Sequence, residues 1–178
     1  MIVLEAYYVF VIIFGIVTLV LLGSLLFVNR LFSRKERIDL LFENVMKYVD
    51  DRILLFERMA NFVEETVEEE IKYVNKLNDS NDILSEMFNS KKYDLKEIQK
   101  SEKLFDKFAE LIDTYPYLGK NEIYNMLVQE GKTNVERILY AVDSYNKKVI
   151  EYNEFKKTKV NSFIAKIFRL KDYEYYSK

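Results

Sequence analysis

The residues best suited to chemistry lie in an acidic run that reads EETVEEE and begins at Glu64. Glu64 and Glu68 stand four positions apart, so on a helix both carboxylates share one face. Two such carboxylates could hold a divalent cation if a second helix supplied further ligands. The alternative is a solvated acidic face. Acid–base catalysis would also require one carboxylate to be desolvated in a cleft.

Several other kinds of site are excluded by residue types that the chain lacks. It contains no Cys and no His, which excludes disulfides, Cys or His zinc sites, thiol nucleophiles and Ser-His or Cys-His pairs. Four Gly and one Pro disfavour a Gly-rich phosphate loop and a turn-rich β protein. The net charge of −2 gives no general case for nucleic-acid binding. We therefore expect a non-enzymatic protein without cofactor, metal or nucleic-acid partner.

Two tyrosines and two asparagines repeat at an interval of seven residues in the C-terminal part. The pairs are Tyr145 with Tyr152 and Asn146 with Asn153. Seven residues are close to two helical turns, so each pair shares a helix face. We expect the rings to fill the core with their hydroxyls at its edge. The amides would either bridge to a neighbouring helix and fix its register or line a peptide-binding groove.

A basic segment follows, with six cations and no acidic residue between positions 156 and 171. Its apolar residues cluster on one helical face, as in helices that lie on anionic lipid. Docking of this face back onto the rest of the protein is the alternative, and the two are compatible. The residues expected to contact lipid are Lys159, Phe163, Lys166, Ile167, Phe168 and Arg169.

The elements that position these residues begin with residues 6–28, an apolar run without a single charge. As a helix it would reach about 34 Å at about 1.5 Å per residue, enough to cross about 30 Å of hydrocarbon. No basic region precedes the run and no small-residue cleavage site follows it, so we expect a permanent span rather than a cleaved signal peptide. Residues 29–37 carry four cations against Glu36. This asymmetry predicts that the N-terminus lies outside and the rest in the cytoplasm.

From Ile38 onward the apolar residues recur with a mean spacing of about 3.6, the α-helical period. The stripe runs through Val74 and predicts one long helix, either separate from the span or continuous with it. A loop is expected at residues 78–81 and a short helix at 82–88. Further helices are expected from Asp94 to Thr114 and, after an N-cap at Asn121, to about residue 160, with a kink or a local break near Gly131.

The predicted fold class is all-α. A single N-terminal transmembrane helix is followed by an antiparallel up-down bundle of three long helices, with the short segment as a fourth candidate. The expected parts are residues 1–32 (N-terminus and span), residues 33–160 (cytoplasmic bundle) and residues 161–178 (basic tail).

Residues 145–153 read YNKKVIEYN, and residues 163–168 read FIAKIF. The first segment resembles the paired Tyr-Asn signature of the LemA family of bacterial membrane proteins, and the second resembles that family's Leu-Ile-Ala-x-x-Phe ending. The matching residues, expected to be structural, are Tyr115, Pro116, Arg137, Ile138, Ala141, Tyr145, Asn146, Tyr152, Asn153, Ile164, Ala165 and Phe168.

The resemblance implies a single-pass protein of the bacterial inner membrane with a helical bundle and no established biochemical activity. It also implies partners among envelope proteins, a membrane protease system included. We expect the bundle to be an adaptor for such partners, and the alternative is a lipid-binding or membrane-organising role of the basic tail. Self-association could use the small residues Gly15, Gly23 and Ser24 in the span.

Overall fold

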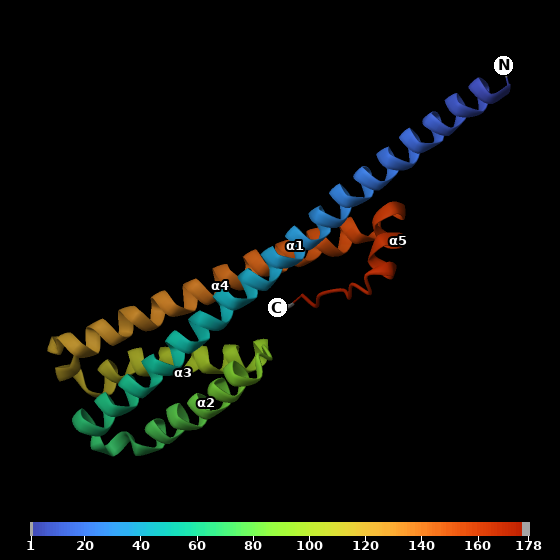
Figure 1. Ribbon diagram of the computed structural model, residues 1–178. Coiled ribbons are helices and arrows are strands. Elements are labelled where there is room, and N and C mark those ends of the chain that lie inside the picture. Colours follow the sequence, from blue (N-terminus) through green and yellow to red (C-terminus); the bar gives the residue numbers. More distant parts are fainter. Residues whose placement is uncertain (1, 176–178) are drawn as a thin grey trace. The chain divides into compact units, whose positions relative to one another are not determined.

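The computed structural model describes the backbone of residues 2–175, and their side chains except those of residues 2–6, 9, 159 and 160. Within this range every regular element is helical and there is no strand, which confirms the all-α prediction (Figure 1). The α-helices are α1 (Ile2–Thr66), α2 (Ile71–Ser90), α3 (Leu95–Thr114), α4 (Glu122–Lys157) and α5 (Lys159–Ile167). Two short 3₁₀ helices are η1 (Glu68–Glu70) and η2 (Pro116–Lys120).

The chain divides into two compact units. The first comprises residues 1–39 and 147–175, and the second comprises residues 40–146. Helices α1 and α4 are long enough to contribute to both units.

The N-terminal part of α1 is an apolar helix that no described part of the chain covers. Its large side chains from Phe10 to Leu26 are exposed, and its most apolar window has a mean hydropathy of 2.9. The helix is therefore long and apolar enough to cross a membrane, as expected for residues 6–28.

The long helix predicted to run through Val74 ends earlier, at Thr66. The backbone leaves the helix at Val67, whose φ of −139° and ψ of 68° are not helical. The break falls inside the acidic run, where a continuous helix would hold like charges on adjacent turns. Val67 itself stays buried, but Ile71, the next residue of the predicted stripe, is 62% exposed.

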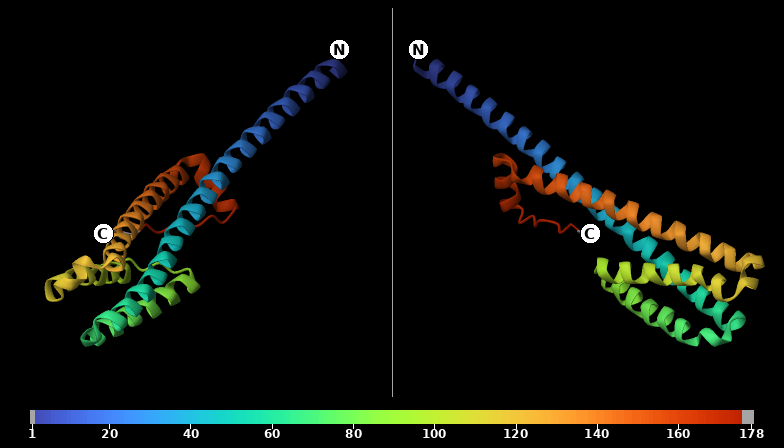
Figure 2. Two further views of the ribbon diagram at one scale, coloured as in Figure 1. Left: turned by 90° about the vertical axis from the view of Figure 1, so that its left-hand side faces the viewer. Right: turned by 180° about the vertical axis from the view of Figure 1, so that it is seen from behind.

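The predicted loop at residues 78–81 was wrong, and so was the separate short helix at 82–88. Both lie inside α2, which is continuous from Ile71 to Ser90. Leu77 and Leu84 are buried two turns apart on one face, whereas Asn78 and Asp79 are exposed. Burial of the apolar face therefore overrides the weak helix propensity of the polar residues. Helices α2 and α3 lie side by side in the second unit (Figure 2).

The predicted helix starts at Asp94 and Asn121 were correct. The Asp94 side chain accepts a hydrogen bond from the backbone N–H of Lys96 at 2.8 Å, and the Asn121 side chain accepts one from that of Tyr124 at 3.1 Å. Each bond satisfies a backbone donor that the first helical turn would otherwise leave unpaired.

The local break expected near Gly131 as the alternative to a kink is absent, because α4 runs unbroken through this position. Gly131 is buried, and a Cβ atom there would lie 2.7 Å from the ring of Phe105 on α3. The missing side chain therefore lets the Phe105 ring press against the backbone of α4. That ring also packs on Phe56 of α1, with centroids 4.9 Å apart.

Candidate functional site

A fully buried arginine forms the polar centre of the second unit. The Arg52 side chain on α1 donates to the Asn134 Oδ1 atom at 2.8 Å, the Ile98 carbonyl oxygen at 3.0 Å and the Ser101 Oγ atom at 2.6 Å. Its guanidinium also lies 5.2 Å from the centre of the Phe105 ring. Asn134 in turn donates to the Tyr48 carbonyl oxygen at 2.9 Å. One side chain thus ties α1 to both α3 and α4.

Burial shifts the pKa values of the two charged groups at this centre, Arg52 and Glu102, in opposite directions. Loss of solvation lowers the pKa of Arg52 to about 10, although Glu102 and Tyr93 raise it. Burial raises the pKa of the Glu102 carboxyl, which Arg52 partly offsets and Asp106 reinforces. The nearest Arg52 nitrogen stands 4.0 Å from Glu102. Neutral hydrogen-bond acceptors therefore hold the guanidinium more closely than the carboxylate does.

Arg52 was not predicted from the sequence, although its position carried a signal. It lies three residues after Val49 and four before Phe56, which places it on the apolar stripe. A charged residue at a stripe position must find buried partners. Those partners come from α3 and α4, and nothing local in the sequence singles them out.

A cleft of about 190 Å³ opens between α3 and α4 in the second unit. Its apolar walls include Leu95 and Ile98 of α3 and Leu139 and Val142 of α4. Its polar lining comes from Gln99, Glu102, Asp143 and Asn146. Asn146 therefore lies at a groove, as one of the two predictions for the paired asparagines requires.

The acidic run does not form the predicted carboxylate pair. Glu64 lies at the end of α1 and Glu68 in η1, beyond the break at Val67, so the two no longer share one continuous helix. Glu64, Glu65, Glu68 and Glu69 are all exposed. Across the described residues, no cluster of three or more acidic side chains is arranged to hold a metal ion.

The chain after α5 folds back along α4 in the first unit (Figure 1). The Asn153 amide donates to the Tyr173 carbonyl oxygen at 2.8 Å, and its Oδ1 atom accepts from the Tyr173 N–H at 3.3 Å. The Tyr173 hydroxyl donates to Asp39 at 2.7 Å. Lys156 pairs with Asp172 at 2.6 Å and donates to the Leu170 carbonyl oxygen at 3.0 Å. Asn153 therefore holds the non-helical segment after α5 in place, whereas the sequence predicted a bridge to a neighbouring helix.

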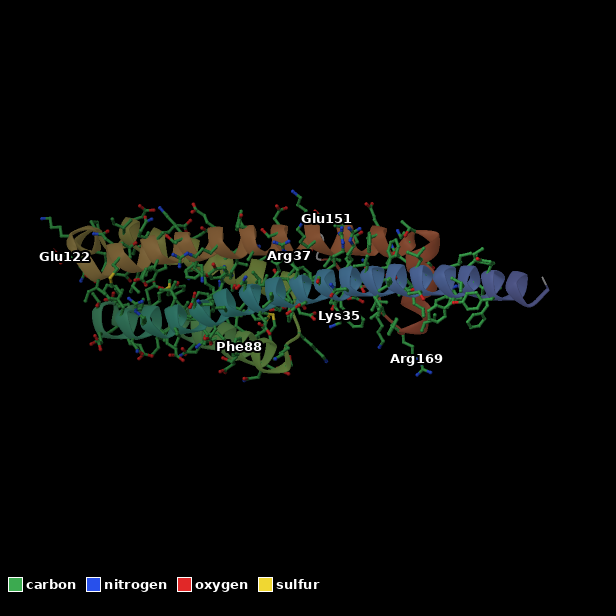
Figure 3. The ribbon with its side chains drawn as sticks, turned by 45° about the horizontal axis from the view of Figure 1, so that its top comes forward. Lys35, Arg37, Phe88, Glu122, Glu151 and Arg169 are labelled. Carbon is green, nitrogen blue, oxygen red and sulfur yellow. The ribbon has the colours of Figure 1, made fainter. Side chains whose placement is uncertain are left out.

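Some apolar residues of α5 and its C-terminal end are buried, and others are exposed. Ile164 and Ala165 are buried, so this part of the tail docks. Phe163 is 67% exposed, Ile167 is 61% exposed and Phe168 is 47% exposed. Lys166 and Arg169 are exposed beside them, and Figure 3 shows Arg169 extending outward. The Lys159 side chain lies outside the described residues.

Residues 29–178, most of the chain, match the LemA family. The chain belongs to the LemA family. No curated protein and no solved structure shows significant similarity to it. Family membership and the one long apolar N-terminal helix together fit a membrane protein.

Six of the twelve residues that resemble LemA motifs are buried. Ile138, Ala141, Tyr145 and Tyr152 are buried, whereas Arg137 is exposed. The Tyr145 ring packs against Phe42 in the second unit, and the Tyr152 ring packs against Tyr173 in the first.

The resembling turn at Tyr115 and Pro116 ends α3. Pro116 is the first residue of η2, and the half-buried Tyr115 ring contacts that of Tyr117 edge-on, with centroids 6.1 Å apart. The turn therefore connects α3 to η2.

Proposed function

We propose that this LemA family member is a non-enzymatic, single-pass protein of the bacterial inner membrane. Its N-terminus lies outside, and its helical part is a cytoplasmic adaptor for envelope proteins, such as a membrane protease. Residues 6–28 form the span. The antiparallel bundle expected from the apolar stripes gives the adaptor a rigid frame, with Arg52 joining three of its helices.

The α3/α4 cleft supports the adaptor role most directly. Its walls are apolar, and the carboxylates of Glu102 and Asp143 line it. Apolar pockets with a few charged groups suit the anchoring side chains of a partner, and the negative charge favours a cationic one. The proposed ligand is therefore a basic, amphipathic segment of another envelope protein.

Site-specific photo-crosslinking in native membranes tests this proposal. A photoreactive amino acid replaces Leu139, which lines the cleft, or Tyr140, the next residue, which is 77% exposed and lines no described cleft. We expect one dominant protein adduct from position 139 and none of it from position 140. Mass spectrometry of the adduct should identify a basic amphipathic segment at the crosslinked site.

Charge reversal in the cleft is the matched biochemical test. Asp143→Lys should reduce that adduct, whereas Lys147→Glu, an exposed change one turn further along α4, should leave it intact. Equal yields from positions 139 and 140, or no reproducible adduct, would reject the cleft as the docking site.

A second candidate function, lipid binding by α5, rests on the exposure of Phe163, Ile167 and Phe168. Three large apolar side chains next to Lys166 and Arg169 are costly in water but suit the boundary of an anionic bilayer. Docking through Ile164 and Ala165 leaves Phe163 and Ile167 available for it, whereas the Phe168 ring also packs edge-on against Phe32.

Fluorescence depth measurement tests lipid contact cleanly because the chain contains no Trp. Phe163→Trp in the full chain, reconstituted with brominated lipids, should give a quenched and blue-shifted signal. Tyr140→Trp, in the second unit, is the control and should not be quenched. The absence of quenching in the Phe163→Trp variant would exclude insertion of α5.

A further inference from the structure

A cationic cleft of about 390 Å³ lies between α1 and α4 in the first unit. It is distinct from the α3/α4 cleft and from the exposed face of α5. Figure 3 shows Arg37 of α1 and Glu151 of α4 on the same side of the molecule, with Lys35 on the other side of α1. The residues that define it are Arg30, Arg34, Arg37, Lys148, Glu151 and Phe155.

The charges that line this cleft are unbalanced. Arg30, Arg34 and Arg37 follow one another at helical spacings of four and three, so they share a face and repel one another. Glu151 is the one carboxylate in the lining, and Lys148 already pairs with it at 2.5 Å. Among the described residues, none of the three guanidinium groups forms an ion pair. An anion in the cleft would relieve this repulsion.

One of the three guanidinium groups is already held in place. The Arg34 guanidinium carbon lies 4.4 Å from the centre of the Phe155 ring, within the range of a cation–π contact. A cation–π contact uses none of the guanidinium N–H groups, so they can still donate to an anion. Two parallel N–H donors match the oxygens of a phosphate group.

The distance of the cleft from the end of the apolar run indicates which kind of phosphate group lies nearest to it. Arg30 and Arg34 follow the apolar run by only two and six residues. They therefore lie about 3–9 Å beyond its end at about 1.5 Å per residue. The polar headgroup layer on each side of a bilayer is about 5–8 Å thick. Arg30 therefore lies within the headgroup layer and Arg34 just beyond it, where its long side chain can reach back to a lipid phosphate.

We propose that the cleft between residues 30–37 of α1 and residues 148–155 of α4 binds the phosphate-bearing headgroup of an anionic phospholipid. The proposal rests on the span in residues 6–28 and is independent of the partner cleft and of α5. Bound lipid would hold the first turns after the span against α4.

Lipid retention by the full chain tests the proposal. The protein is reconstituted in nanodiscs of phosphatidylcholine with a minor share of phosphatidylglycerol, then extracted, and bound lipids are measured by native mass spectrometry. We expect enrichment of phosphatidylglycerol on the wild-type chain. Arg34→Gln should weaken its affinity about tenfold, the loss expected for one strong charge-assisted hydrogen bond.

The matched control is Lys35→Gln, which removes the same charge one residue away. Lys35 is bonded to Asp39 at 2.8 Å and does not line the cleft, so the affinity should change less than about twofold. Arg169→Gln is the control for the basic tail and should likewise have little effect on the retained lipid.

Three results would overturn the proposal. Equal losses from Arg34→Gln and Lys35→Gln would show general charge attraction instead of a site. Displacement of phosphatidylglycerol by millimolar inorganic phosphate would assign the cleft to a soluble anion. A wild-type chain that incorporates into nanodiscs but shows no preference for phosphatidylglycerol would exclude the site while leaving the span intact, whereas failure to incorporate would contradict the span itself.

Discussion

At the scale of single residues, Arg52 connects the helices of the second unit. Its hydrogen bonds reach Ile98 and Ser101 on α3 and Asn134 on α4, and the side chain has no exposed surface. Removing the Arg52 side chain leaves these three buried acceptors without their hydrogen-bond donor, which costs free energy. The connection therefore depends on the donor geometry of this one side chain.

Arg52→Ala should lower the free energy of unfolding by about 3–5 kcal/mol, the usual cost of breaking a buried polar pair on one side. Chemical denaturation of the full chain measures it. Arg58→Ala is the matched control, because Arg58 pairs with Glu130 at the surface and should cost about 0–1 kcal/mol. Similar losses for the two variants would contradict a special role for Arg52.

Glu102→Gln should raise the melting temperature at pH 7. Burial raises the folded-state pKa of Glu102 above its ordinary value of 4.5. The carboxyl group therefore contributes its full stability below that value and loses it as the pH rises through the folded-state pKa. Melting curves across this range should show the advantage of the variant disappearing below about pH 4.5.

Glu57→Gln, at an exposed position of α1, is the surface control and should change the melting temperature little at pH 7. A large loss of stability for Glu102→Gln at pH 7 would instead mean that the carboxylate, more than the neutral acceptors, holds Arg52.

At the scale of elements, Gly131 sets how closely α3 and α4 approach. Gly131→Ala gains about 1 kcal/mol in helix propensity, but the new Cβ atom would lie 2.7 Å from the Phe105 ring. We expect a net destabilisation of about 1–3 kcal/mol from overpacking, measured by chemical denaturation. Adding Phe105→Leu should recover part of the loss. A stabilised Gly131→Ala variant would show that the helices can move apart.

The helical stripes and caps could be read from the sequence because they depend on neighbours within one or two turns. Asp94 and Asn121 are found at the predicted helix starts for this reason. The break at Val67 and the continuity of α2 could not be predicted, since both depend on which apolar faces meet in space. The hydrogen bonds between Asn153 and Tyr173 could not be predicted for the same reason, because they join residues 20 positions apart.

At the scale of the whole molecule, the proposed functions all depend on the apolar stretch of α1. Its side chains between Phe10 and Leu26 are exposed in the chain by itself, and a bilayer is the environment that would cover them. The partner cleft, the lipid cleft and the tail all acquire their proposed roles from this anchor. Composition alone indicated it, because length and the absence of charge are properties of the sequence and need no tertiary contact.

Cysteine labelling tests the anchor most directly, since the chain has no Cys of its own. Ile16→Cys and Leu40→Cys are each treated with a membrane-impermeant maleimide in right-side-out and inside-out vesicles. We predict that position 16 reacts in neither until detergent is added, and that position 40, an exposed residue beyond the span, reacts only in inside-out vesicles. Labelling of position 16 in intact vesicles of either orientation would contradict the central claim.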